Sequence, residues 1–199
     1  LLEEYRPGII CHVDSLNYED ETLFTRCSQY LDAPFDVAHG GGIFQSKTLQ
    51  TYFVADQKPG SLKKGLERLC RYAEDAVNDG FEVLILCDRA VDSDHATIPS
   101  LLATSAVHHH LIRKGLRGKV GIVVEAGDVW EVHHFACLIG FGATAINPYL
   151  ALSSIRDMKE SGKLQTDITE DQLKKNYIKA VNDGLLKVLS KMGISTLQS

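Results

Sequence analysis

The sequence has no long hydrophobic run and no surplus of basic charge. Its longest apolar stretches, such as Val83–Cys87, are far shorter than the roughly 20 residues that a membrane-spanning helix needs. Lys and Arg number 21 against 26 Asp and Glu, so the net charge of −5 leaves no excess of cations to neutralise a phosphate backbone. We therefore expect neither a membrane nor a nucleic acid as a partner.

Paired cysteine motifs are also missing. The five cysteines are odd in number and widely spaced, at Cys11, Cys27, Cys70, Cys87 and Cys137. Without a Cys-x-x-Cys pair, a disulfide framework, a zinc site and a complete iron–sulfur site are all disfavoured, and reduced thiols indicate the cytoplasm or a plastid. The chain opens on Leu1 without Met or a basic region leading into an apolar stretch, so we expect no secretory signal and interpret it as a segment of a longer polypeptide.

Two common catalytic signatures are missing as well. There is no Gly-x-Ser-x-Gly nucleophile elbow and no Gly-x-Gly-x-x-Gly dinucleotide loop. The three glycines at 40–42 have no Lys-Ser or Lys-Thr after them, which favours a flexible turn over a phosphate loop. We therefore assign no catalytic residue from sequence motifs alone.

From Ser61 onward the sequence alternates regularly between helical and strand patterns. Ser61 is the expected cap of a helix that Gly80 ends, with Leu62, Leu66 and Leu69 facing a sheet. Buried strands are predicted at 81–88, 119–125 and 144–147, and helices at about 99–115, 128–141, 150–161 and 169–189. This alternation indicates an α/β fold whose parallel sheet has right-handed crossovers, either open or part of a β/α barrel. Three strands cannot close a barrel, so a partial barrel is expected.

Several local features complete this assignment. Residues 48–54 have the composition of a strand, 89–97 read as a polar loop, and 191–197 resemble the start of another strand. For helix 128–141 the apolar stripe is predicted to be Val129, Val132, Ala136 and Ile139. Thr169 with Gln172 is expected to form a capping box, and Ile168 with Leu173 a hydrophobic staple.

Histidines are the most conspicuous candidates for metal ligands. Five of the eight lie in two clusters, 108–110 and 133–134. Neighbouring side chains on a helix diverge by about 100°, so neither cluster chelates a metal well by itself. One His from each cluster, with Glu125 or Asp128, could still meet at a metal; the alternative is partly buried imidazoles that bond backbone carbonyls or helix ends.

Polar side chains follow the predicted strands at the edge where α/β proteins bind ligands. Asp88, Arg89, Glu125 and Asn147 all lie at carboxyl ends of strands. They form either a functional site or the polar ends of buried strands that cap the next helices.

Seven stretches together resemble the large subunit of glutamate synthase. They are residues 84–89 (LILCDR), 98–111 (IPSLLATSAVHHHL), 123–127 (VVEAG), 131–136 (EVHHFA), 145–151 (AINPYLA), 176–180 (NYIKA) and 190–196 (SKMGIST). The resemblance is to the central domain and the first element of the following FMN domain, and it covers residues 61–199 well.

The resemblance implies an enzyme that converts glutamine and 2-oxoglutarate into two glutamates, using FMN and an iron–sulfur cluster. It implies that residues 1–60 and 61–155 belong to the central domain, and that 156–199 connect to the FMN barrel. This segment would link the glutaminase and FMN domains, line part of the ammonia passage and not be catalytic alone. The electron donor would be ferredoxin or an NAD(P)H-dependent small subunit. In the intact enzyme, Met192, Gly193 and Ser195 would contact FMN.

Two alternatives remain open. The chain could be a stand-alone α/β enzyme that uses Asp88, Glu125 and the histidines, or it could be a metal-binding or regulatory module. The resemblance itself implies no metal ligand in this segment.

Overall fold

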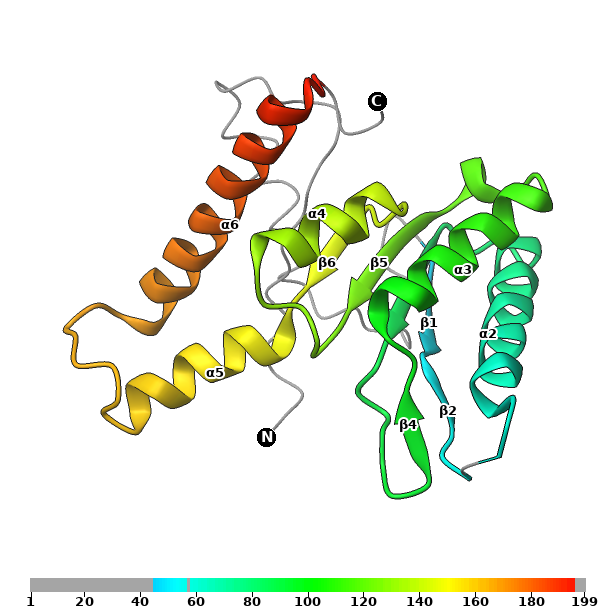
Figure 1. Cartoon of the computed structure of the whole chain (residues 1–199), viewed down its shortest axis with the longest axis horizontal. Helices are drawn as coiled ribbons and strands as arrows, with labels where there is room; N and C mark the ends of the chain where they lie inside the picture. The colour runs from blue at the N-terminus through cyan, green and yellow to red at the C-terminus, as the bar shows by residue number, and fades with distance from the viewer. Residues whose placement is uncertain (1–44, 57, 196–199) are drawn as a thin grey trace.

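The computed structural model describes residues 45–56 and 58–195 (Figure 1). The glycine turn predicted at 40–42 and two of the cysteines lie outside these residues. Among the helices described, none combines the length and the apolar character needed to cross a membrane.

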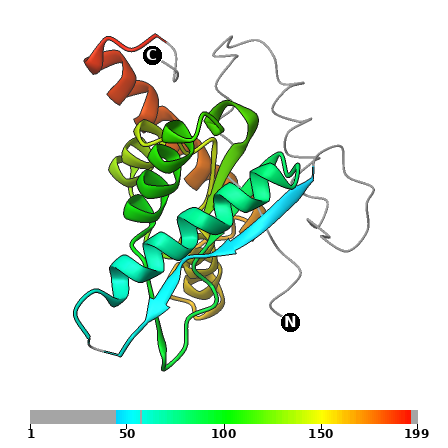
Figure 2. The same ribbon diagram turned by 90° about the vertical axis from the view of Figure 1, so that its right-hand side faces the viewer.

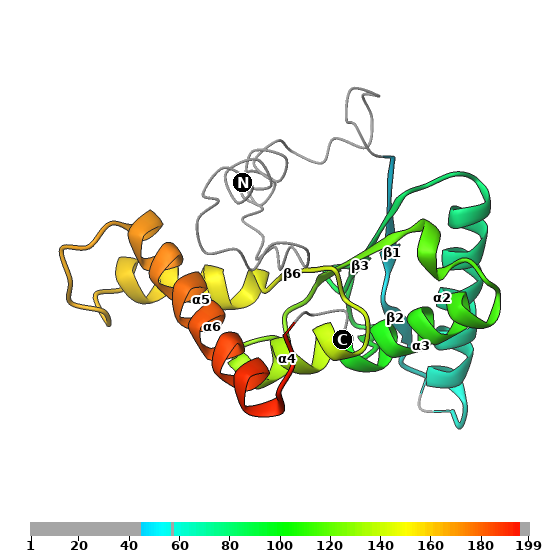
Figure 3. The ribbon, with the colours of Figure 1, turned by 90° about the horizontal axis from the view of Figure 1, so that it is seen from above.

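A four-stranded parallel sheet forms the centre of the molecule. Its strands are β1 (Ser46–Gln50), β3 (Val83–Cys87), β5 (Gly121–Glu125) and β6 (Ala145–Asn147), hydrogen-bonded in that order. Three helices, α2 (Ser61–Asn78), α3 (Ser100–Arg113) and α4 (Val132–Gly140), lie on the same face of the sheet (Figure 3). Strands that follow one another without reversal, with helices outside, are arranged as in part of a β/α barrel. The predicted α/β class and partial barrel are confirmed, with β1 as an additional strand.

The main core lies between this sheet and the three helices. Leu84 and Leu86 of β3 and Ile122 and Val124 of β5 alternate toward the helices, as the two-residue period of a strand requires. From the helices come buried Leu69, Ala73, Val107, Leu111, Phe135 and Leu138. Leu62 and Leu66 are only partly buried at the margin of this core, so Leu69 is the residue of the predicted stripe that the core encloses.

A short antiparallel ribbon extends beyond the carboxyl edge of the sheet. It pairs β2 (Tyr52–Val54) with β4 (His95–Thr97) (Figure 2). The strand predicted at 48–54 is therefore two strands in two sheets, separated at Thr51. The Thr51 N–H donates to the Cys87 carbonyl, and the Thr51 carbonyl accepts from the Ile98 N–H. The polar loop predicted at 89–97 is wrong for its last three residues. A three-residue strand is too short for periodicity to reveal.

Two helix starts differ from the sequence-based expectation. Helix α2 begins after Gly60, which is its N-cap in place of Ser61 and has a positive φ of 91°. Helix α4 begins at Val132, because the Glu131 and His134 side chains each bond the other's backbone N–H in a reciprocal capping box. Its fully buried residues are Phe135 and Leu138. The expected stripe also packs on the core: Val129 is buried just before the helix, and Val132, Ala136 and Ile139 are partly buried.

The remaining helices extend beyond the β6 edge of the sheet. They are α5 (Tyr149–Glu160) and α6 (Glu170–Met192), and a 3-10 turn, η1 (Arg117–Lys119), precedes β5. The Thr169 hydroxyl accepts from the Gln172 N–H at 3.3 Å, but the Gln172 side chain bonds Asn176, so only half of the predicted capping box forms.

The end of α6 differs from the strand predicted at 191–197. The helix continues through Met192, and Gly193, at a φ of 68°, is its left-handed C-cap. The strand prediction is therefore wrong for residues 191–195, while residues 196 and 197 lie outside the described residues.

Candidate functional site: a polar network at the carboxyl edge of the sheet

Pairing of the strands aligns a row of side chains at the carboxyl edge of the sheet. Gln50, Cys87, Glu125 and Asn147 are in register on β1, β3, β5 and β6. They alternate with the core residues, so they belong to the face opposite the helices, which in a closed barrel would be its interior. The strand ends therefore bring Glu125 and Asn147 together, as the sequence predicted.

Glu125 is the centre of the network. Its side chain is buried, and its Oε1 accepts from Arg89 Nε at 3.0 Å and from Asn147 Nδ2 at 3.2 Å. The Arg89 guanidinium also stacks on the Tyr149 ring, 3.7 Å from its centroid. A buried carboxylate is tolerated when a cation and hydrogen bonds compensate it, and Arg89 and Asn147 supply both.

Asp88 extends the network toward the loop after β5. Its Oδ2 accepts from the Gly127 N–H at 2.8 Å. Burial raises the pKa of the Asp88 carboxyl above its ordinary value, although the Gly127 N–H and the nearby Tyr149 hydroxyl act in the opposite direction. Burial and the Asp88 charge also raise the pKa of Tyr149, so its hydroxyl stays protonated.

Gly127 allows Tyr149 to approach this loop. A Cβ at position 127 would lie 2.9 Å from the Tyr149 hydroxyl, closer than side chains tolerate. Glycine is therefore required here by proximity, and the Tyr149 ring can lie under Arg89 at the same time.

The network offers buried hydrogen-bond acceptors. Among the described residues, Asp88 Oδ1 and Asn147 Oδ1 are buried side-chain oxygens without a hydrogen-bond partner, and both residues are 7% exposed. Cys87 stands in the same row, but burial raises the pKa of its thiol to about 12, so the thiolate needed for attack is not formed near neutral pH. The arrangement can accept hydrogen bonds from a small donor.

The histidines do not converge. In the first cluster, His108 accepts from Arg117 Nε at 2.9 Å, His109 Nδ1 lies 2.8 Å from the Ser105 carbonyl, and His110 Nε2 lies 2.7 Å from Glu74. His134 accepts from backbone N–H groups at the start of α4. The interpretation that these imidazoles bond carbonyls and helix ends is confirmed for His109 and His134.

Metal ligands were the alternative use of these histidines. Within residues 45–56 and 58–195, no three His, Cys, Asp or Glu side chains are grouped so that they could hold a metal ion. Asp128, a possible extra ligand, instead accepts from the Ser100 N–H at the start of α3, at 3.0 Å. No observation on the described residues favours the metal-binding alternative.

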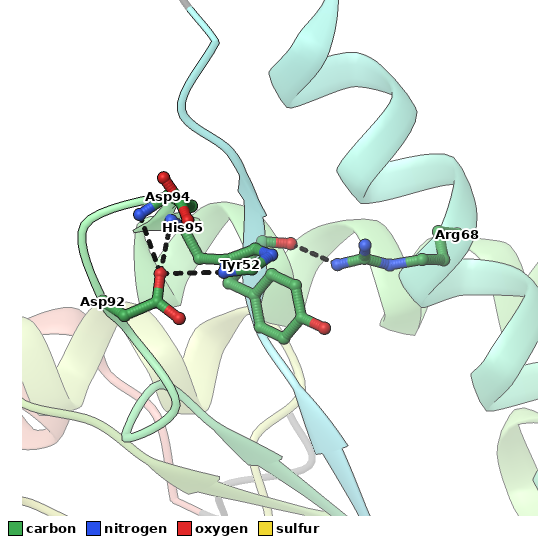
Figure 4. Close-up of polar contacts among 5 residues, drawn as sticks. All are labelled: Tyr52, Arg68, Asp92, Asp94 and His95. Atoms are coloured by element: carbon green, nitrogen blue, oxygen red, sulfur yellow. Dashed lines mark hydrogen bonds and ion pairs between the residues drawn. The ribbon is translucent and has the colours of Figure 1, made fainter.

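A second polar cluster attaches the ribbon to α2 (Figure 4). Arg68 stacks on the Tyr52 ring and donates to the Tyr52 carbonyl at 2.5 Å, and the His95 ring packs edge-on against the same tyrosine. Asp92 Oδ1 accepts from the backbone of Asp94 and His95 and lies 2.9 Å from His95 Nδ1. These contacts hold the ribbon against α2.

Sequence reasoning identified four members of the carboxyl-edge network and missed two. Asp88, Arg89, Glu125 and Asn147 were found because they end strands. Tyr149 and Gly127 were missed because their roles depend on contacts between residues far apart in sequence. The available signal was the placement of Tyr149 two residues after the end of β6.

The residues expected to contact FMN are far from this network. Met192, Gly193 and Ser195 lie at the end of α6, on the other side of the molecule from the carboxyl edge (Figure 1). Met192 is 69% exposed, and a Cβ at Gly193 would have no neighbour within 4 Å. The described residues around them do not enclose a cofactor, and their role stays a prediction.

The fold and the network define an α/β partial barrel with a buried polar edge. Comparison with known families agrees with this class: the family model of the glutamate synthase central domain matches residues 29–199. The chain belongs to that family.

Three relatives illustrate the range of the match. The chain is 47% identical to ferredoxin-dependent glutamate synthase 2, chloroplastic, of Arabidopsis thaliana over 172 residues, which is 80% of this chain and 10% of that protein. Identity is 50% to the glutamate synthase [NADPH] large chain of Bacillus subtilis over 69% of this chain, and 43% to glutamate synthase [NADH] of Schizosaccharomyces pombe over 75%. These matches span 9% and 7% of the two relatives, so the chain corresponds to about a tenth of such proteins or less.

Proposed function

We propose that this chain is the part of a glutamate synthase that connects the glutaminase to the FMN domain and lines part of the ammonia passage between them. The family match over residues 29–199, in relatives at least ten times longer than the matched part, carries the proposal. The carboxyl-edge network supports it, because it provides buried polar groups with free hydrogen-bond acceptors at Asp88 and Asn147.

The whole enzyme would transfer ammonia from glutamine to 2-oxoglutarate and reduce the product to glutamate. FMN and an iron–sulfur cluster would supply the reducing electrons, taken from ferredoxin or from an NAD(P)H-dependent subunit. Relatives carry names for ferredoxin-, NADPH- and NADH-dependent forms, and nothing in this segment distinguishes the three. The enzyme's compartment would be the cytoplasm or, by the same comparison, a plastid, since one Arabidopsis relative is named as chloroplastic and another as chloroplastic/mitochondrial.

Within the passage, the network's contribution would be hydrogen-bond acceptance. Ammonia is a donor of three N–H groups, and Asp88 Oδ1 and Asn147 Oδ1 are buried acceptors without a described donor. The Arg89 and Glu125 charges neutralise each other in an ion pair. A neutral molecule such as ammonia could therefore pass without separating the two charges.

Substitution of Asn147 in the full-length enzyme tests this role. Asn147→Leu keeps the branching and the number of heavy atoms of the side chain and removes its acceptor and its donor to Glu125, so we expect free ammonia to escape during turnover while glutamine hydrolysis keeps its rate. Asn78→Leu, at an exposed position of α2, is the matched control and should release none. Ammonia release that is equal in both variants and in the unaltered enzyme would refute the assignment of the network to the passage.

The purified 199-residue chain tests the stand-alone alternative. We expect it to hydrolyse no glutamine and to form no glutamate, because the described residues contain no activated nucleophile. Ammonia release that is lost in Asp88→Asn and Glu125→Gln variants would establish an independent active site instead.

A further inference from the structure

The parallel sheet has a second face that carries apolar side chains. One row across the four strands consists of residues in register: Thr48, Ile85, Val123 and Ala145. Their neighbours along each strand face the helices, so this row belongs to the opposite face. It runs parallel to the polar row that contains Glu125 and Asn147. The second face is therefore apolar across its middle and polar at its carboxyl edge.

Burial of this face is unexpected from the described elements. Ile85 and Cys87 are each 3% exposed and Ala145 is 8% exposed, yet none of the three belongs to the core that the helices make with the sheet. Helices α2, α3 and α4 lie on the opposite face, and α5 and α6 extend beyond the β6 edge (Figure 3). Parallel sheets are normally covered on both faces, so something must cover this one.

We propose that residues 1–44 of this chain pack on the second face of the sheet. The segment joins the sheet at the amino end of β1, where the Gln45 carbonyl accepts from the N–H groups of Glu82 and Val83 at 2.8 and 3.1 Å. Four strands about 4.8 Å apart are about 15 Å wide. Even a fully helical segment of this length would reach about 66 Å at about 1.5 Å per residue, several times that width.

Two observations favour this occupant over a second copy of the chain. Ile85, Cys87 and Ala145 are already shielded within a single chain, so no second molecule is needed to bury them. The family match begins at residue 29, which places the last part of the segment in the same domain as the sheet.

Charge supports the same choice. Residues 1–44 contain eight Asp and Glu against two Arg, a net charge of −6, whereas residues 45–199 carry a net charge of +1. The acidity of the chain is thus confined to the segment, and the remaining residues are close to neutral, so packing the segment on them brings no like net charges together. Two such segments from different copies would repel each other.

Photo-crosslinking in the full chain tests the proposal. p-Benzoylphenylalanine is placed at Val123, a half-buried position in the middle of the row, and crosslinked peptides are identified by mass spectrometry after irradiation. We expect crosslinks within one chain to peptides from residues 1–44. Tyr72, which is 54% exposed on α2, carries the probe in the control and should give none to that segment.

Thr48, on the same row, carries the probe if circular dichroism shows that the Val123 derivative is unfolded. Crosslinks from a folded derivative to a second copy, to α5 or to α6 would overturn the proposal. A folded derivative that gives no crosslink at all would overturn it equally, because the face would then be open.

Discussion

The close contact between α4 and α6 leads to the sharpest stability prediction. Gly184 of α6 lies against Val132 of α4, and a Cβ at position 184 would be 2.9 Å from Val132 Cγ1, 3.2 Å from its Cβ and closer still to Cγ2. All three atoms belong to a β-branched side chain that has essentially one rotamer in a helix, so rotation about χ1 cannot relieve the overlap. Gly184→Ala should therefore push the two helices apart.

The magnitude follows from two opposing effects. Overpacking of a close contact costs about 1–3 kcal/mol, whereas replacing glycine by alanine inside a helix gains up to about 1 kcal/mol. Gly140 of α4 provides the control, because a Cβ there would meet nothing within 4 Å. Gly140→Ala should keep the gain without the strain, so the two variants should differ by about 1–3 kcal/mol in their free energies of unfolding.

Urea unfolding of both variants, followed by circular dichroism, measures this difference. Combining Gly184→Ala with Val132→Ala removes the overlapping methyl groups, so in that background the alanine at 184 should stabilise the protein as it does at 140. If Gly184→Ala stabilises the protein as much as Gly140→Ala, or if Val132→Ala does not change its effect, α6 does not pack on α4 in this way.

Three further predictions concern the core, pH and flavin. Leu69→Ala should cost about 2–5 kcal/mol in urea unfolding, as Leu69 is 1% exposed, and a loss no larger than that of Tyr72→Ala would refute the core assignment. Burial and the Arg117 charge lower the pKa of His108 below the unfolded value of about 6.5. The free energy of unfolding should therefore be highest above that pH and should decline as the pH falls below it. A His108→Gln variant whose free energy of unfolding declines as steeply between pH 7 and 5.5 would contradict this. The purified chain should bind added FMN no better than millimolar, because the end of α6 at Gly193 does not enclose a cofactor, and micromolar quenching of flavin fluorescence would contradict that.

The parts of the fold that the sequence predicted are those with strong, continuous patterns. Strand β3 was recognisable because three consecutive residues, Leu84, Ile85 and Leu86, are buried on both faces of a parallel sheet. Strand β4 is three residues long and includes His95, and its pairing with β2 is a contact between distant segments that no local pattern contains. Helix α4 started later than expected because a side-chain cap at Glu131 decides its first turn.

The candidate site was predictable to the same extent. The rule that ligands bind at the carboxyl ends of parallel strands selected Glu125 and Asn147 before their hydrogen bond was known. It could not select Tyr149, whose position under Arg89 depends on how α5 leaves the sheet. Divergence of adjacent side chains on a helix correctly predicted that the His108–His110 cluster would not gather around one point.

The sequence of the transcript on both sides of codons 1–199 tests the central claim most directly. The account predicts one continuous reading frame, with a glutaminase domain before this segment and an FMN domain after it. A start codon immediately before Leu1 together with a stop codon immediately after Ser199 would contradict the account, because the chain would then be a complete protein and could not connect two domains of a glutamate synthase.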